Sequence, residues 1–284
     1  MKPPPFSYAM VDTLDEACDL IHDDSEAKIL AGGQSLVPLL SMRLAQPTVV
    51  VDIQQLDALQ GIDMADHDLR IGAMTTHARL EKATGEDSSI PMLAEAARHI
   101  AHPQIRNRGT VGGSLAHADP AGEWPVVMLA LDATVAVRSV LDAHTVPIDE
   151  LFAGPYMTTL APDEIVTDVY VPLVERAWSF QELARRVGDF GLCLVAVALD
   201  ITGRISTDVR IAVGGATTVA CRASEAESAL NGMELSDVAI SGAAQIAGRS
   251  LPLTSDIHGS AEYRRQLVQV LVERALRDAR QKQR

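Results

Sequence analysis

Two short stretches of the chain each carry a pair of glycines next to small hydroxyl residues, and both could bind an anion. The first is Ala31-Gly32-Gly33-Gln34-Ser35 and the second is Thr110-Val111-Gly112-Gly113-Ser114. Glycine lets the backbone turn sharply and approach a ligand closely, and amides at a helix start have no partner inside the helix. Several N–H donors, with the hydroxyls of Ser35, Thr110 and Ser114, suit the oxygens of a diphosphate. The two stretches together predict a cofactor that bears a diphosphate.

A Gly-Gly pair on its own is most often an ordinary turn. The third pair, Gly214-Gly215, illustrates this case, because no helix start follows it, and we expect it to end a strand. Neither of the first two stretches is followed by Gly-Lys-Ser/Thr, so a P-loop is not indicated, and neither contains G-x-G-x-x-G, so a Rossmann dinucleotide site is not supported. Plain turns remain the alternative reading of both stretches.

Several polar residues follow the second glycine pair. We expect His117 to form a polar wall beside the ligand, and Asp119 to cap a helix whose first position is Pro120. Glu123 then falls in the first turn of that helix, ahead of an apolar run that would bury it. A buried carboxylate needs a partner, and a ribose or ribityl hydroxyl or a ring N–H would serve.

Other chemistry is not indicated. The histidines near the glycine pairs show no H-x-x-x-H or H-E-x-x-H spacing, so no metal ligand is predicted. No Ser/His/Asp or Cys/His set assembles, so no catalytic residue is assigned. Arg106 and Arg108 precede the second pair and either contact phosphate or lie on the surface.

The elements that must position these residues form three units. A strand over 28–31 leads into the first glycine pair and a helix over 36–43 follows it. Together with a helix over 13–22 capped by Thr13 and a strand over 48–53, they predict a β-α-β-α-β unit at 1–57. A second α/β unit is expected at 58–175. A small antiparallel sheet with three helices is expected at 176–284. The fold class is α+β.

Composition limits the function further. The chain has 284 residues and a formal net charge of −14, from 24 Lys+Arg against 38 Asp+Glu, which argues against a nucleic-acid groove. The three cysteines, Cys18, Cys193 and Cys221, form no C-x-x-C pair, so a zinc or iron–sulfur site within the chain is not expected. No signal peptide and no membrane span is recognised, which predicts a cytoplasmic protein.

The two glycine stretches, read with their neighbours, resemble a known family. Ala31-Gly32-Gly33-Gln34-Ser35-Leu36-Val37-Pro38 and the run from Arg106 to Pro120 look like the two flavin motifs of the FAD-binding medium subunit of molybdenum hydroxylases, the xanthine dehydrogenase and aerobic carbon monoxide dehydrogenase family. The run Ala184-Arg185-Arg186-x-Gly188-Asp189-Phe190 and the C-terminal unit resemble it too, so the likeness covers essentially the whole chain.

The resemblance implies a fold and a set of binding residues. The fold is the vanillyl-alcohol-oxidase (PCMH) type, with two α/β subdomains, a C-terminal domain and non-covalent FAD. The residues implied to hold the diphosphate and ribityl chain are Ile29, Leu30, Ala31, Gly32, Gly33, Gln34, Ser35 and Leu36, and Thr110, Val111, Gly112, Gly113 and Ser114. Those implied to border the flavin are Ile100, Glu123, Leu160 and Gln181, the last of which stands where xanthine dehydrogenase relatives carry a lysine.

The resemblance also implies a division of labour. Substrate, either CO or an N-heteroaromatic or purine-like molecule, would be oxidised at a molybdopterin site on a separate large subunit. Electrons would pass through [2Fe–2S] clusters on a small subunit to FAD here, and on to a quinone, O2 or another acceptor. The complex would be a dimer of heterotrimers. The alternatives are a stand-alone FAD oxidase or dehydrogenase of the same fold, and a non-catalytic scaffold.

Overall fold

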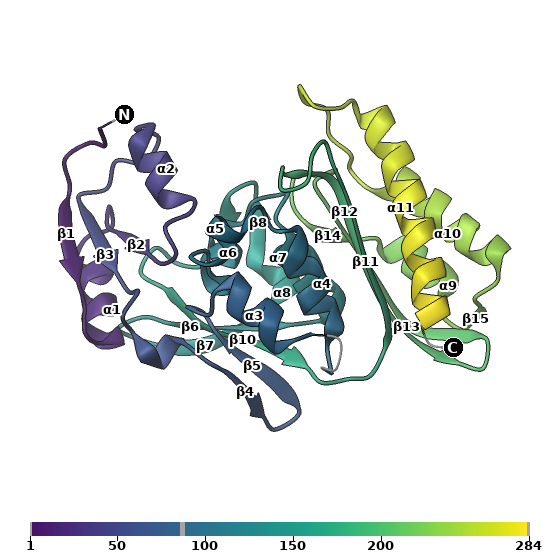
Figure 1. Cartoon of the computed structure of the whole chain (residues 1–284), viewed down its shortest axis with the longest axis horizontal. Helices are drawn as coiled ribbons and strands as arrows, with labels where there is room; N and C mark the ends of the chain where they lie inside the picture. The colour runs from purple at the N-terminus through teal and green to yellow at the C-terminus, as the bar shows by residue number, and fades with distance from the viewer. Residues whose placement is uncertain (1, 86–88, 283–284) are drawn as a thin grey trace.

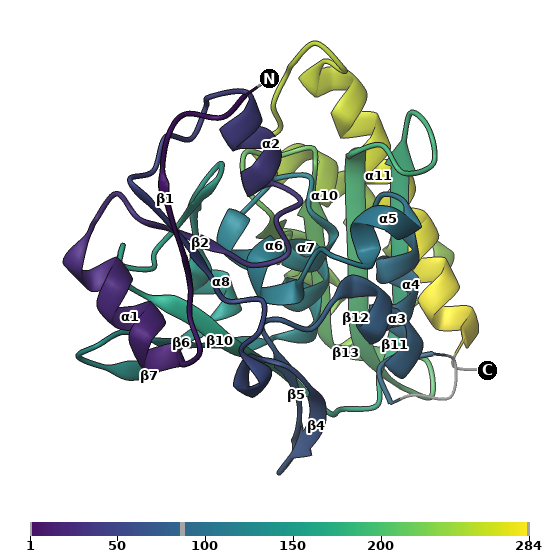
Figure 2. The same cartoon turned by 60° about the vertical axis from the view of Figure 1, so that its left-hand side comes forward.

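A computed structural model describes residues 2–85 and 89–282 and arranges three sheets in succession from the N-terminal to the C-terminal end of the molecule (Figures 1 and 2). The first sheet is parallel and has the order β1-β3-β2. Its strands and the two helices that connect them are β1 (Ser7–Met10), α1 (Leu14–Asp23), β2 (Lys28–Leu30), α2 (Leu36–Ser41) and β3 (Val49–Asp52). The predicted β-α-β-α-β order is therefore confirmed.

The helix caps of this part follow from the sequence. The Thr13 hydroxyl accepts a hydrogen bond from the Glu16 N–H at 3.2 Å and so starts α1 as predicted. Helix α2 ends at Ser41, two residues before the predicted end, and Arg43 then adopts a left-handed conformation with φ of 60°.

The second sheet is antiparallel, with the order β4-β5-β10-β6-β7. Its strands are β4 (Ile62–Ala65), β5 (Asp68–Gly72), β6 (Thr134–Arg138), β7 (Ala143–Pro147) and β10 (Ile165–Pro172), and a two-stranded sheet of β8 (Phe152–Gly154) and β9 (Met157–Thr158) lies nearby. The 3-10 helix η1 (Asp57–Leu59) leads into β4. A group of short helices lies between this sheet and the third one (Figure 1): α3 (His77–Ala83), α4 (Pro91–His99), α5 (Pro103–Arg106), α6 (Val111–His117), α7 (Glu123–Leu131) and α8 (Ile148–Leu151).

The third sheet is antiparallel, with the order β11-β12-β13-β14 and with β15 paired to β13. Its elements are β11 (Ala177–Ala184), β12 (Gly191–Thr202), β13 (Ile205–Gly214), β14 (Cys221–Arg222) and β15 (Met233–Glu234), with helices α9 (Ser224–Leu230), α10 (Asp237–Ser250) and α11 (Ala261–Lys282). Strand β13 ends at Gly214, so the third glycine pair marks a strand end as predicted.

Both faces of the third sheet are covered. Helices α4 and α7 pack on one face, and α11 packs on the other. Successive residues of β12 therefore alternate between two apolar clusters: Leu194 and Ala196 belong to the main core, while Cys193 and Val195 belong to a second core under α10 and α11. Burial on both faces explains why β12 reads as an almost continuous apolar run.

Helix α7 is the centre of the main core. Every residue from Trp124 to Leu131 is buried, as the sequence predicted. The helix does not begin at Asp119, however, so that prediction is wrong. Ala118, in a left-handed conformation, ends α6, the Asp119 carboxylate accepts from the Ala121 N–H at 2.9 Å in a separate turn, and Gly122 is the residue that precedes α7.

No helix within residues 2–85 and 89–282 combines the length and apolar character that crossing a membrane requires.

Candidate cofactor-binding site

The two glycine loops touch each other. A Cβ added to Gly32 would lie 2.2 Å from the Arg108 carbonyl oxygen and 2.8 Å from the Gly109 Cα. On the other side, a Cβ added to Gly113 would lie 3.5 Å from the Ala31 Cβ. Only glycine fits at position 32 without moving the backbones apart. One molecule can therefore contact the loop between β2 and α2 and the loop before α6 at the same time.

The first loop carries free donors. Gly33 has a φ of 74°, which reverses the chain direction between Leu30 and the start of α2. In the part of the chain that the structure describes, no hydrogen bond occupies the backbone N–H groups of residues 32–35, or the Ser35 hydroxyl. The Gln34 amide instead folds back and donates to the Gly32 carbonyl oxygen at 3.0 Å. Consecutive free amides in a turn are the donor set that an anion such as a diphosphate requires.

The second loop differs, and the expectation that it presents free backbone donors is wrong for residues 111–114. The Val111 N–H donates to Thr75 at 3.0 Å, and the Gly112 N–H donates to Ala73 at 2.9 Å. The Gly113 N–H donates to the Thr110 hydroxyl and the Ser114 N–H to the Thr110 carbonyl oxygen. These bonds fix the shape of the loop. Within residues 2–85 and 89–282, the Ser114 hydroxyl and the Thr110 N–H have no hydrogen-bond partner, and the Thr110 hydroxyl accepts from Gly113 but keeps its own proton, so these are the donors that this loop can offer a ligand.

The glycines of the second loop serve packing. A Cβ on Gly112 would lie 2.5 Å from the Ala73 Cβ, and one on Gly109 would lie 2.6 Å from the His77 Nε2. His77 is buried, and its Nδ1 accepts a hydrogen bond from the Trp124 Nε1–H at 2.9 Å. Burial, together with the charge of Arg106, lowers the pKa of His77 from 6.5 to about 4, so this imidazole is neutral at pH 7.

The two arginines before the second loop have structural partners. The Arg106 guanidinium donates to the carbonyl oxygens of Ile100 and Ala101 at 3.1 and 3.3 Å and forms an ion pair with Glu81 at 3.2 Å. It holds the turn after α4, where Ala101 has a φ of 39°. Arg108 donates to the Gln54 side chain at 2.6 Å and so ties the second loop to the end of the first sheet.

Beyond the second loop, His117 and Asp119 both contact the side chain of Tyr156. The His117 and Tyr156 rings are 5.2 Å apart between centroids. Burial, the negative charge of Asp119 and a hydrogen bond to that carboxylate raise the pKa of Tyr156. His117 is thus a polar residue beside an aromatic ring, and Asp119 holds the hydroxyl of that ring.

Glu123 sits at the start of α7 in a setting that disfavours its charge. Burial raises the pKa of Glu123 from 4.5 to about 8, and the charges of Glu182 and Asp119 add to this effect. The side chain of Glu182 is only 4% exposed, and burial raises its pKa to about 7. Burial thus disfavours the charge of both carboxyl groups, one on α7 and one on β11, and His99 Nδ1 lies 3.7 Å from the Oε2 of Glu182.

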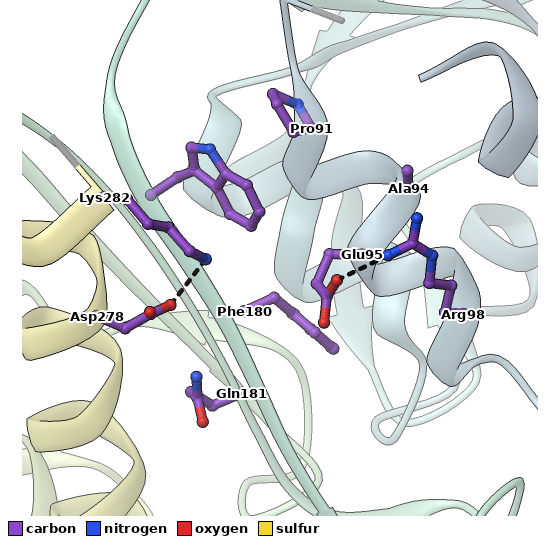
Figure 3. Close-up of a pocket in the computed structure, with 9 residues that line it drawn as sticks. Pro91, Ala94, Glu95, Arg98, Phe180, Gln181, Asp278 and Lys282 are labelled. Atoms are coloured by element: carbon purple, nitrogen blue, oxygen red, sulfur yellow. Dashed lines mark hydrogen bonds and ion pairs between the residues drawn. The ribbon is translucent and has the colours of Figure 1, made fainter. Parts of the chain in front are cut away.

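Gln181 lies on the face of β11 opposite to Glu182, and its contact with the flavin stays a prediction. Its amide donates to the Ser179 hydroxyl at 3.2 Å, and Ser179 donates to Asp278 of α11. Figure 3 shows Phe180 and Gln181 extending from opposite sides of β11, with Gln181 toward Asp278. Because side chains alternate along a strand, Glu182 shares the face of Phe180. The sequence analysis named Gln181 and not Glu182, and strand alternation from the apolar Phe180 two residues earlier is the signal that places Glu182 on the face toward α4 and α7.

The two remaining candidates are apolar and lie at the main core. Ile100 is buried at the end of α4, and Leu160 packs against the same cluster, which also contains Trp124. Ile29 packs instead against the core of the first sheet. Among the described residues, no group of three or more His, Cys, Asp or Glu side chains is placed to hold a metal ion.

Comparisons with known proteins identify the family of this chain. A family model described as the FAD binding domain in molybdopterin dehydrogenase matches residues 4–174, and one described as the CO dehydrogenase flavoprotein C-terminal domain matches residues 178–279. The chain belongs to the FAD-binding medium subunits of the molybdenum hydroxylases. The chain is thus part of an oxidoreductase, and it has the fold of this family.

Three members illustrate the likeness. The nicotine 6-hydroxylase medium subunit of Paenarthrobacter nicotinovorans is 50% identical over 98% of this chain and 99% of its own. The carbon monoxide dehydrogenase medium chain of Hydrogenophaga pseudoflava is 35% identical over 98% of both. The solved structure of quinoline 2-oxidoreductase from Pseudomonas putida 86 matches with a TM-score of 0.95 and 37% identity, over 99% of both chains.

The residues of this medium subunit fit FAD. The four amides of residues 32–35 have no hydrogen-bond partner among the described residues, in a loop where only glycine fits at position 32. The neighbouring second loop is fixed by hydrogen bonds to Thr75, Ala73 and Thr110. On β11, the buried Oε2 of Glu182 has no hydrogen-bond partner among the described residues. An orphaned buried oxygen calls for a ligand with a polar edge.

Proposed function

We propose that this medium subunit binds FAD across the two glycine loops. The diphosphate would accept hydrogen bonds from the amides of residues 32–35 and the hydroxyls of Ser35 and Ser114. The flavin end would lie toward Ile100, Leu160 and Glu123. The contact between Gly32 and the Arg108–Gly109 backbone supports the proposal most strongly, because it makes one continuous surface from two loops.

The three-unit division at 1–57, 58–175 and 176–284 and the cytoplasmic location stay predictions. Each predicted unit contains one of the three larger sheets.

Bound FAD would supply a carrier of electron pairs, which the side chains of this chain cannot provide. The protein holds the cofactor, excludes water from it and sets its polar contacts. We propose that electrons arrive from [2Fe–2S] clusters of a small subunit and leave to a quinone, O2 or another acceptor. Substrate would be oxidised at molybdopterin on a large subunit, in a dimer of heterotrimers.

An N-heteroaromatic compound is the substrate class we propose for the complex. The 50% identical relative is named as part of a nicotine hydroxylase, whereas the carbon monoxide dehydrogenase chain is 35% identical. The preference rests on this difference in identity, because the residues that would select the substrate lie on another subunit.

Native co-purification from the source cells tests the proposal. The expected result is a complex of three chains that contains molybdenum and iron, with FAD that stays with this chain when the subunits are separated. A yellow chain that purifies alone, lacks both metals and oxidises a small substrate by itself would instead establish a stand-alone flavin oxidase. A purified chain that takes up no FAD on titration would refute the binding site itself.

A further inference from the structure

Gln54 connects the first sheet to the loop before α6. It lies two residues after β3, the central strand of that sheet, and its Oε1 accepts a hydrogen bond from the Arg108 guanidinium at 2.6 Å. Arg108 is exposed, and Gln54 is its only side-chain partner within residues 2–85 and 89–282. The carbonyl oxygen of Arg108 is also the atom nearest to a Cβ added at Gly32. One residue of the second loop thus contacts the first unit twice, through its guanidinium and through its backbone.

The Asp52 carboxylate holds Gln54 from the other side. Its Oδ1 accepts from the Gln54 backbone N–H at 2.8 Å, and its Oδ2 accepts from the Gln54 side-chain amide at 3.3 Å. Asp52 is buried, and the Tyr8 hydroxyl on β1 donates to the same Oδ2 at 2.6 Å. Hydrogen bonds therefore run without a break from Tyr8 through Asp52 and Gln54 to Arg108, and these four residues are called the Gln54 network below.

The chemistry of its neighbours allows the Gln54 amide one orientation. A carboxylate only accepts hydrogen bonds, and a guanidinium only donates them. The amide therefore turns its NH2 group to Asp52 and its oxygen to Arg108. Gln54 thus joins an acceptor to a donor, and a side chain that lacks either function breaks the network at this point.

The network stands on the part of the first sheet that leads into the first glycine loop. Asp52 is the parallel partner of Leu30, the last residue of β2, and the Ile53 N–H donates to the Leu30 carbonyl oxygen at 3.2 Å. Ala31 and Gly32 follow directly in the chain. One end of the network is therefore fixed where the first loop begins, and its other end holds the loop before α6.

Other polar contacts join the first unit to the second at a different place. On α1, His22 pairs with Asp163 at 2.9 Å, and Asp15 pairs with Arg138 of β6. Figure 2 shows α1 beside β6 and β7, away from α2 and α6. None of these four residues belongs to a glycine loop, so the two ion pairs hold the units together without setting the geometry of the loops.

We propose that Gln54 and Arg108 are positioning residues of the FAD site, and that the Gln54 network sets the spacing of the two glycine loops on which FAD affinity depends. The proposal rests on the proposed function, because it requires FAD to bind across both loops. It assigns the guanidinium of Arg108 to Gln54, whereas direct binding of the diphosphate by Arg108 would make Gln54 dispensable.

Titration of FAD into the apoprotein, followed by flavin fluorescence, measures the effect. Gln54→Leu and Arg108→Met both break the network between these two residues, and each should raise the Kd about five- to tenfold. The double variant Gln54→Leu/Arg108→Met should bind no more than about twofold weaker than either single variant, because both substitutions remove the same contact. Independent effects would multiply to about 25- to 100-fold and would overturn the proposal.

Direct contact between Arg108 and the diphosphate predicts a different pattern. Arg108→Met would then weaken FAD binding, while Gln54→Leu would leave the Kd unchanged or lower it, since the released guanidinium could turn to the phosphate. That pattern would contradict the positioning role.

A rescue experiment separates positioning from a general loss of stability. In Asp52→Asn, the Oδ1 stays bound to the Gln54 backbone N–H, so the new NH2 group faces the NH2 group of Gln54 and the Kd should rise about fivefold. Adding Gln54→Glu restores a donor opposite an acceptor, and the new carboxylate still accepts from Arg108. The double variant Asp52→Asn/Gln54→Glu should therefore bind FAD within about twofold of the unmodified protein. A double variant that binds no better than Asp52→Asn would overturn the proposal.

His22→Ala is the matched control, because it removes a contact between the same two units but none at the glycine loops. Its FAD Kd should stay within about twofold of the unmodified value. If His22→Ala weakened binding as much as Gln54→Leu, any loosening of the units would suffice and the specific role of the network would be refuted. Urea unfolding of each apoprotein establishes that the variants fold, and should Asp52→Asn not fold, Gln54→Leu and Arg108→Met carry the test.

The outcomes separate the two proposals. Absence of FAD binding by the unmodified protein would contradict the proposed function. Tight FAD binding that neither Gln54→Leu nor Arg108→Met weakens would overturn the role of the network while leaving the binding site intact.

Discussion

The closest contact between the two loops gives the sharpest prediction. In Gly32→Ala, the new methyl group would lie 2.2 Å from the Arg108 carbonyl oxygen, so the loops must move apart by about 0.8 Å before that contact reaches 3.0 Å. The neighbours are backbone atoms and cannot swing away like a side chain. Overpacking of this kind lowers the free energy of unfolding by about 1–3 kcal/mol. Gly32 has no left-handed φ, so the whole effect comes from the methyl group.

Displacement of the loops should also separate the free amides of residues 32–35 from the hydroxyl of Ser114. Loss of one or two hydrogen bonds to a charged diphosphate, at about 1.5 kcal/mol each, predicts an FAD Kd about 10- to 100-fold higher. Fluorescence titration of the apoprotein with FAD measures this Kd, and urea unfolding measures the loss in free energy of unfolding.

Gly242→Ala in α10 is the control for Gly32→Ala. Nothing lies within 4 Å of the added Cβ there, and alanine is the better helix former, so stability should rise by about 0.5–1 kcal/mol with FAD affinity unchanged. If Gly32→Ala bound FAD as tightly as the unmodified protein, the two loops would not share one ligand.

Three further predictions concern the support of the second loop. Gly112→Ala places a methyl group 2.5 Å from the Ala73 Cβ and should lower the free energy of unfolding by about 1–3 kcal/mol; an unchanged urea midpoint would contradict the packing role. Arg106→Met removes the hydrogen-bond donor of the Ile100 and Ala101 carbonyl oxygens and of the Glu81 carboxylate. It should therefore lower the free energy of unfolding by about 1–3 kcal/mol. An unchanged free energy of unfolding would instead indicate that Arg106 serves only a ligand. Folding lowers the pKa of His77 to about 4, so the neutral imidazole contributes fully to stability above about pH 6.5. As the pH falls toward 4, the free energy of unfolding should decrease by about 3 kcal/mol. His77→Gln should flatten this part of the stability profile, and parallel urea curves of both proteins between pH 4 and 7 would refute the assignment.

Features that depend on neighbouring residues could be predicted from the sequence. The cap of α1 by Thr13, the β-α-β-α-β order around it and the strand end at Gly214 each follow from a local pattern. The burial of Trp124 to Leu131 follows equally from a run with no charged side chain.

Features set by contacts between distant residues could not be predicted from the sequence. The amides of Val111 and Gly112 are occupied by Thr75 and Ala73, more than thirty residues earlier, so the local pattern alone suggested free donors. The side of β11 on which Gln181 falls depends on how the strand packs between α4 and α11. At Asp119, the capping pattern was real, but it closed a turn instead of starting a helix.

The position of the third sheet has a consequence for attempts to shorten the protein. Phe180, Leu194 and Ala196, which follow β10 in the chain, are buried in the same apolar cluster as Trp124 and Val127 of α7. A fragment that stopped after Pro172 would uncover one side of α7, and a fragment that began at Ala177 would uncover the matching side of β12. Neither half should be an autonomous folding unit, and the intact chain should melt in a single cooperative step.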